Sequence, residues 1–142
     1  MYPQSITLAV SSDRRLAATA CKASSPEHAV VRVYDTTRWQ PLGVPLAGHT
    51  LTVTAIAFSP DDAHVLTVSR DRSWRLFARR EGEGARFCLT CVESVLMRCV
   101  VSFMPVAADK SHARIIWDCA WAHENDVFAT ASRDKTVGAA WL

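Results

Sequence analysis

The sequence lacks any apolar run of the roughly 18 residues that a membrane-spanning helix needs, so we expect no such span and no membrane partner. The longest apolar-looking stretch, residues 92–106, is interrupted by Glu93 and Arg98. Residues 1–4 lack a basic region followed by an apolar block, so we also expect no secretory signal.

An excess of charge is also lacking, because the 142 residues carry a net charge of only +2. So small a charge does not by itself indicate nucleic-acid binding. The five cysteines are an odd number, which without a secretory signal indicates reduced thiols and a cytoplasmic or nuclear protein. The hydrophobic share of 49% and charged share of 21% are typical of a folded globular domain.

No window of the sequence has a sustained helical period; short β-rich runs alternate with turns instead. We predict strands over residues 6–10, 16–20, 30–34, 52–58, 65–68, 74–77, 115–121 and 127–131, and from residue 136 onward. The turn after residue 58 is set by Ser59 and by Pro60, whose ring fixes φ. Many short strands at this spacing predict an all-β sandwich, barrel or propeller.

Two segments repeat the same polar residues at the same spacing, which indicates a structural repeat. In each segment a His precedes an Asp by 22 residues, and a Ser-Arg-Asp tripeptide ends on that Asp. The corresponding residues are His49, Ser69 and Asp71 in the first segment and His112, Ser132 and Asp134 in the second.

A Ser, a His and an Asp together also suggest a catalytic triad, with Ser69 as the nucleophile of a hydrolytic site. A hydrolase needs one such site, with the Ser on a strained turn near an oxyanion hole. Here the trio occurs twice and no G-x-S-x-G motif is present. We therefore expect no catalytic residues, no cofactor and no small-molecule substrate.

The trio resembles the hydrogen-bonded tetrad of WD-repeat proteins, in which a His, a strand Ser or Thr, a turn Asp and a strand Trp join inside a propeller blade. Gly48-His49, Ser69 and Asp71 match three members, and Phe77 stands where the Trp would be. Because Phe77 has no N–H to donate, this tetrad is predicted to be incomplete. In the second segment Ala140 takes the Trp position, and the Trp follows at residue 141.

Two other constellations compete with this interpretation. Cys88 and Cys91 have zinc-knuckle spacing, but a structural zinc needs four ligands, and Cys99, His112 and Cys119 are scattered, so we expect no metal site. The arginines between residues 70 and 80 form either an RNA-binding patch or, as we favour, a solvated turn and strand end.

The sequence further resembles the second-subunit family of the Elongator complex, in the middle of that family's second propeller. The resemblance covers residues 5–87 and 105–137 and rests on the matching segments ACKA (20–23), EHA (27–29), HTLTVT (49–54), SRDR (69–72) and RIIW (114–117).

The resemblance implies a non-catalytic scaffold that joins the largest Elongator subunit to the catalytic, radical-SAM and acetyltransferase-like subunit. That complex modifies wobble uridine in tRNA and has been linked to transcription by RNA polymerase II, so any tRNA contact of this chain is expected to be indirect. The alternative is an unrelated WD-repeat adaptor. In the WD-repeat family the residues around the turn Asp reach the partner-binding top face, which here implies Arg70, Arg72, Arg133 and Lys135.

The resemblance also implies the fold class, a partial WD-repeat β-propeller of about three four-stranded blades over residues 1–142. The predicted parts are blade 1 (about 5–47), blade 2 (about 48–91), an atypical insert (about 88–104) and a truncated blade 3 (about 111–142). The insert separates His49 from His112 by 63 residues, whereas a WD repeat takes about 40–45. Residues 88–104 and 138–142 depart from the family pattern; we interpret both as gene-model errors, with a natural interblade loop as the alternative for 88–104.

Overall fold

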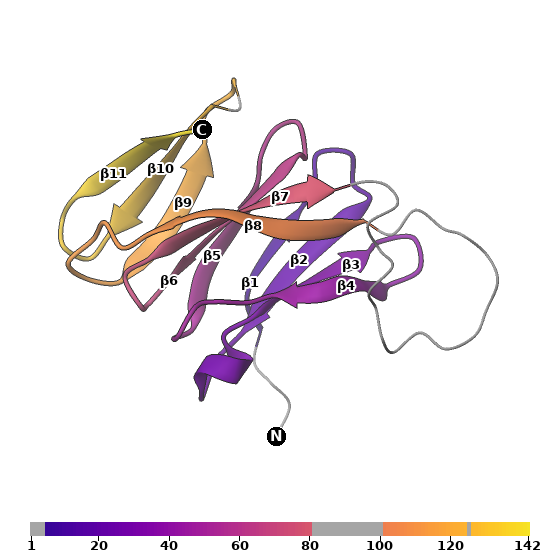
Figure 1. Ribbon diagram of the computed structural model, residues 1–142, viewed down its shortest axis with the longest axis horizontal. Coiled ribbons are helices and arrows are strands. Elements are labelled where there is room, and N and C mark those ends of the chain that lie inside the picture. Colours follow the sequence, from indigo (N-terminus) through magenta and orange to yellow (C-terminus); the bar gives the residue numbers. More distant parts are fainter. Residues whose placement is uncertain (1–4, 81–100, 125) are drawn as a thin grey trace.

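The computed structural model describes residues 5–80, 101–124 and 126–142, which form three antiparallel β-sheets side by side (Figure 1). Blade 1 contains strands β1 (Ser5–Val10), β2 (Leu16–Cys21), β3 (Val31–Asp35) and β4 (Gln40–Leu46). Blade 2 contains β5 (Val53–Phe58), β6 (His64–Ser69), β7 (Trp74–Arg80) and β8 (Ser102–Asp109). Blade 3 contains β9 (Ile116–Trp121), β10 (Val127–Ser132) and β11 (Val137–Trp141).

Within each blade the strands follow one another in chain order, each paired antiparallel with the next. Blades 1 and 2 have four strands, and blade 3 has three in the described residues. The innermost strands of neighbouring blades touch, β1 against β5 and β5 against β9. This meander-by-meander order is that of a β-propeller, and the prediction of an all-β partial propeller is confirmed.

The nine strands predicted from the sequence are all present, but two further strands were missed. β4 contains Pro41 and Pro45, and β8 contains Pro105. Proline cannot donate a hydrogen bond to a strand ladder, so it weakens the sequence signal, yet it is tolerated on an edge strand. Both missed strands are the outer edges of their sheets.

The position of β8 corrects the predicted boundary between blade 2 and the insert. Residues 102–104 lie in β8, where Phe103 pairs with Arg79 and packs against the core that blade 2 shares with blade 1. The insert predicted over 88–104 therefore ends too late. Blade 2 continues beyond residue 91 through β8, and residues 88–100 lie outside the described residues.

Two apolar cores join the blades face to face. The first lies between blades 1 and 2 and is built from alternate residues of their strands, among them Leu16, Val33, Val53 and Val65. The second lies between blades 2 and 3, where Leu66 and Leu76 pack against Phe128. In β6 the odd-numbered side chain Val65 faces blade 1 and the even-numbered Leu66 faces blade 3, as the two-residue strand period requires.

The two outer faces of the stack expose apolar side chains. On β1, Leu8 and Val10 are 62% and 53% exposed. On β11, Val137 and Trp141 are 75% and 78% exposed. A short 3-10 helix, η1 (Pro26–His28), lies between β2 and β3. No helix in the described residues is long and apolar enough to cross a bilayer.

Candidate functional site

The first tetrad lies at one end of blade 2, where the segment between β4 and β5 meets the turn between β6 and β7. Nδ1 of His49 lies 3.0 Å from Oδ2 of Asp71, and Nε2 lies 2.8 Å from Oγ1 of Thr67. An ionised carboxylate only accepts hydrogen bonds, so Nδ1–H donates to Asp71, and Nε2 shares a hydrogen bond with the Thr67 hydroxyl. The His49 ring is therefore used at both nitrogens, and its side chain is only 2% exposed.

The strand hydroxyl of this tetrad is Thr67, which corrects the assignment of Ser69. Ser69 is fully buried, and its Oγ lies within hydrogen-bond distance of the carbonyl oxygens of Leu51 and Thr52, at 2.9 and 3.0 Å. The same oxygen accepts the backbone N–H of Asp71 at 3.2 Å. Ser69 thus fastens β6 to the segment before β5. A hydroxyl held in this way is not available as a nucleophile, so Ser69 does not fit the hydrolytic alternative.

The second tetrad repeats this geometry in blade 3. Nδ1 of His112 lies 3.1 Å from Oδ2 of Asp134, and Nε2 lies 2.8 Å from Oγ1 of Thr130. Thr130 therefore replaces Ser132 in the predicted set. The Ser132 hydroxyl bonds the carbonyls of Arg114 and Ile115 instead, as Ser69 does in blade 2.

The Thr residues had a sequence signal that the spacing argument did not use. Each lies 18 residues after its His, as Thr67 after His49 and Thr130 after His112. The Ser of each Ser-Arg-Asp tripeptide lies only two residues before the Asp, so sequence proximity favours the Ser over the Thr. Side chains alternate along a strand, so the Thr and the Ser two residues later lie on the same face. They differ in their partners: the Thr contacts the His ring, and the Ser contacts backbone carbonyls.

The fourth position of the tetrad holds no donor in either blade. Phe77 is 3% exposed and packs in the core between blades 1 and 2. In blade 3 the corresponding residue is Ala140, since Ala140 pairs with Phe128 as Phe77 pairs with Val65. Trp141 lies one residue further on, on the opposite face of β11, and is exposed. Among the described residues the network thus runs through His, Thr and Asp, with a second hydroxyl beside the Asp.

That second hydroxyl belongs to Ser73 in blade 2 and to Thr136 in blade 3. Each donates to the Oδ1 atom of its Asp at 2.5 Å, and each lies near Nδ1 of its His, at 3.2 and 3.0 Å. Neither residue was singled out from the sequence.

Hydrogen bonding governs the ionisation of both tetrad carboxylates. Burial raises the pKa of Asp71, but the hydrogen bonds from His49 and Ser73 outweigh burial and hold that pKa well below its ordinary value of 3.8. For Asp134 the hydrogen bonds from Thr136 are the largest effect, and they lower its pKa in the same direction. Both side chains are therefore anions at neutral pH.

The four basic residues predicted at a partner-binding face lie on the two turns that carry the tetrad Asp. Arg70, Arg72, Arg133 and Lys135 are all exposed. Arg72 and Lys135 have left-handed backbone, with φ of 74° and 70°, and occupy equivalent places in their turns. The structure thus places two pairs of cations at the same end of neighbouring blades.

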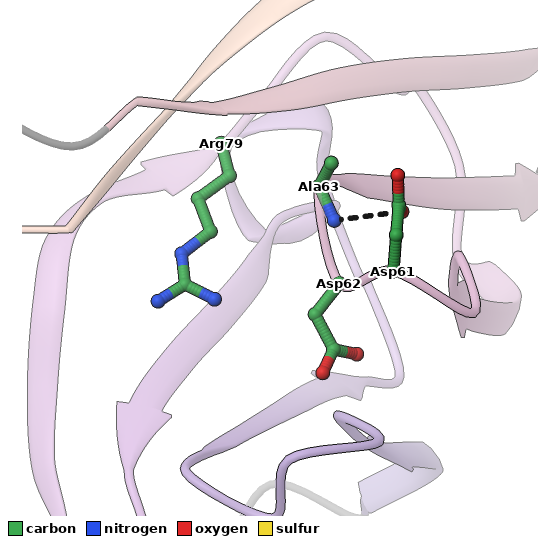
Figure 2. Close-up of a pocket in the computed structure, with 4 residues that line it drawn as sticks. All are labelled: Asp61, Asp62, Ala63 and Arg79. Atoms are coloured by element: carbon green, nitrogen blue, oxygen red, sulfur yellow. Dashed lines mark hydrogen bonds between the residues drawn. The ribbon is translucent and has the colours of Figure 1, made fainter.

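The opposite end of the stack holds a contact between blades that the sequence did not reveal. Asp62, in the turn between β5 and β6, accepts the backbone N–H groups of Ser12 and Asp13 at 2.7 and 2.8 Å. Asp13 lies 3.9 Å from Nη1 of Arg79. Figure 2 shows Arg79 beside the turn that carries Asp61 and Asp62; these residues and Ala63 line a small open pocket. The bonds of Asp62 fasten blade 2 to blade 1.

The residues weighed as zinc ligands are not brought together within the described part of the chain. Both ring nitrogens of His112 are engaged in the tetrad. Burial raises the pKa of the Cys119 thiol to about 12, which disfavours the thiolate that a metal requires. Residues 5–80, 101–124 and 126–142 hold no cluster of His, Cys, Asp or Glu able to bind a metal ion. Cys88, Cys91 and Cys99 lie outside the described residues.

Comparison with known proteins identifies the same repeats and a set of similar proteins. The family model for the WD domain, G-beta repeat, matches residues 39–77 and 103–138. The chain is 42% identical over 131 residues to Elongator complex protein 2 of Schizosaccharomyces pombe, and 39% identical over 132 residues to that of Mus musculus. For Saccharomyces cerevisiae the value is 38% over 132 residues. These alignments cover 91–93% of this chain but only 15% of each relative.

Proposed function

Because the chain belongs to the WD-repeat family and is similar to Elongator complex protein 2 over nine-tenths of its length, we propose that it is a non-catalytic binding module of an Elongator subunit. The observation that carries the proposal is the pair of tetrads: every polar group with catalytic potential at the two His sites is hydrogen-bonded within its own blade. Fully hydrogen-bonded networks of this kind make the turns that carry them rigid.

In this role the chain is part of a scaffold between the largest Elongator subunit and the catalytic subunit, in the cytoplasm and nucleus. It supports modification of tRNA wobble uridine without contacting the reacting atoms. The surface we assign to a protein partner is the exposed basic set Arg70, Arg72, Arg133 and Lys135, because arginine is enriched at protein interfaces and the tetrads hold these turns rigid.

Affinity purification of the cellular protein that contains this chain tests the proposal. Recovery of the other Elongator subunits is expected, whereas a different set of partners, such as a ubiquitin ligase, would contradict it. Reversing the charge of Arg70 and Arg133 to Glu is expected to reduce that recovery. Arg80→Glu is the matched control, because Arg80 is also exposed but lies at the far end of β7.

The substitution Ser69→Ala distinguishes the hydrolytic alternative from the proposed binding module. A propeller enzyme would lose activity with its fold intact, whereas the contacts of Ser69 with Leu51 and Thr52 predict a loss of stability.

A further inference from the structure

Blade 1 presents an exposed tryptophan on the hairpin between β3 and β4. Trp39 is 66% exposed, although tryptophan is normally largely buried in folded proteins. Its backbone is left-handed, with φ of 54°, at the point where hairpins of this kind usually place glycine. A bulky side chain is costly in this conformation, and strained positions of this kind cluster at binding and active sites.

The hairpin is held rigid by bonds to its own strand. The backbone N–H of Trp39 donates to the carbonyl of Asp35 at 2.7 Å. The Asp35 carboxylate accepts the backbone N–H groups of Thr37 and Arg38 at 2.7 and 3.3 Å. A partner that binds Trp39 therefore does not have to order the turn first.

A second turn lies directly beside this hairpin. Thr36 donates its backbone N–H to the carbonyl of Arg15 at 3.0 Å and its hydroxyl to the carbonyl of Arg14 at 2.6 Å. The turn between β1 and β2 and the turn between β3 and β4 thus stand together at one end of blade 1 (Figure 1). This is the end opposite the tetrads.

Three arginines lie on the two turns at this end: Arg14 and Arg15 between β1 and β2, and Arg38 next to Trp39 between β3 and β4. Arg14, Arg15 and Arg38 are all exposed, and no described carboxylate forms a salt bridge with any of them. Asp35 accepts the backbone N–H of Thr37 in its own hairpin, and Asp13 accepts from Ser11 and from the backbone of Arg15. The Asp13 carboxylate also attracts the charges of Arg79 and Arg15. Arg14 and Arg38 are therefore available for anions supplied from outside, whereas Asp13 partly offsets the charge of Arg15.

We propose that Trp39, Arg14, Arg15 and Arg38 form a docking surface for an acidic peptide segment of a partner protein. Tryptophan and arginine are the residue types that dominate the binding energy of protein interfaces. The planar guanidinium fork pairs with carboxylates through two parallel hydrogen bonds. A single aromatic ring on a protruding turn does not offer the succession of stacking rings and the basic groove that single-stranded RNA uses.

This surface is independent of the assignment to Elongator and of the basic residues at the tetrad end. The two proposals can therefore fail separately. If Trp39→Gly binds the acidic peptide as the wild type does, only the docking surface is contradicted, and recovery of the Elongator subunits is unaffected.

The test is fluorescence anisotropy of the full chain with a labelled peptide of alternating Glu and Leu residues. Trp39→Gly and Arg38→Glu are each expected to weaken binding by about tenfold or more, the loss typical of a central interface residue. Glycine suits the left-handed backbone at position 39, so Trp39→Gly is expected to keep the thermal midpoint. Trp117→Ala, which removes a tryptophan 52% exposed on blade 3, is the matched control and is expected to leave binding unchanged.

Three results would overturn the proposal. The first is equal binding of the acidic peptide to the wild type and to Trp39→Gly, or no binding at all. The second is a lower thermal midpoint for Trp39→Gly, which would mark Trp39 as a packing residue. The third is a preference for an oligouridine strand over the acidic peptide, which would assign the surface to single-stranded RNA.

Discussion

Blades 2 and 3 build the same polar network in different surroundings. The His–Thr distance is 2.8 Å in both blades, and the His–Asp distance is 3.0 Å in one and 3.1 Å in the other. Yet the strand beside the Thr carries Arg75 and Phe77 in blade 2, and Gly138 and Ala140 in blade 3. The network is therefore set by the loop that carries the His and the turn that carries the Asp.

The two blades differ in the residue that pairs with the tetrad Thr on the neighbouring strand. In blade 2 the guanidinium of Arg75 lies so close to Gly48 that a Cβ there would stand 2.6 Å from Nη1. In blade 3 the equivalent of Arg75 is Gly138, where a Cβ would lie 2.9 Å from Oγ1 of Thr130 and 3.0 Å from Nε2 of His112. At this position blade 2 therefore accommodates the long side chain of Arg75, whereas blade 3 has room only for glycine.

The largest expected effect comes from a substitution in the core that blades 2 and 3 share. Phe128 is 2% exposed and packs edge-on against Trp74 and Trp121, with ring centroids 4.9 and 5.4 Å apart. Phe128→Ala is expected to lower the free energy of unfolding by about 3–5 kcal/mol, with blade 3 lost first. Urea denaturation with hydrogen exchange measures this. Val137→Ala, at a side chain 75% exposed, is the control, and equal effects would contradict the assigned core.

The next effect compares the tetrads directly. Asp71→Ala leaves His49 and the backbone N–H of Thr50 without their acceptor. Since leaving a buried group unpaired costs about 1–3 kcal/mol, we expect a loss of about 2 kcal/mol in chemical denaturation. Asp134→Ala is expected to cost less because the network of blade 3 is less buried: Ser69 is fully buried, whereas its counterpart Ser132 is half-buried. An unchanged thermal midpoint for Asp71→Ala would contradict the tetrad assignment.

A smaller effect tests the fourth strand position. Gly138→Ala places a methyl group against Thr130 and His112, and we expect a loss of about 1–2 kcal/mol from this overpacking. Arg75→Ala is expected to cost less, because the backbone of blade 2 already accommodates a Cβ there. Denaturation curves of the two variants would show the reverse order if Arg75 were an essential part of its tetrad.

The smallest and most gradual effect is that of acid. The pKa of Asp71 is lowered in the folded chain, so its contribution to stability is present above the ordinary value of 3.8. It is lost progressively as the pH falls below 3.8 towards the folded pKa. The urea midpoint of the wild type should therefore fall on acidification below pH 3.8, and that of Asp71→Asn should fall less. Parallel curves for the two proteins would show that Asp71 is not the group responsible.

The sequence predicted most of the fold because apolar alternation and turn residues mark a strand wherever one face is buried. It failed at β4 and β8, since Pro41, Pro45 and Pro105 interrupt that pattern and both strands are sheet edges. Pairing with β7 explains why residues 102–104 belong to blade 2, although the sequence pattern assigned them to the insert.

For the site, spacing identified the His and Asp of each tetrad but chose the wrong hydroxyl. Ser69 and Thr67 lie on one face of β6, and both are buried polar residues, so local chemistry does not distinguish them. The distinction depends on where the loop of His49 reaches the strand. The bonds of Asp62 to blade 1 were equally beyond prediction, because they join residues 49 and 50 positions apart.

Those bonds of Asp62 have a consequence for biosynthesis. The turn that follows β1 leaves the ribosome with two backbone donors that find their acceptor only when the second blade has been made. Until then the first sheet is an unfinished structure, with its apolar face uncovered as well. We therefore expect blade 1 to reach its final structure during synthesis only after the first strands of blade 2 have been made.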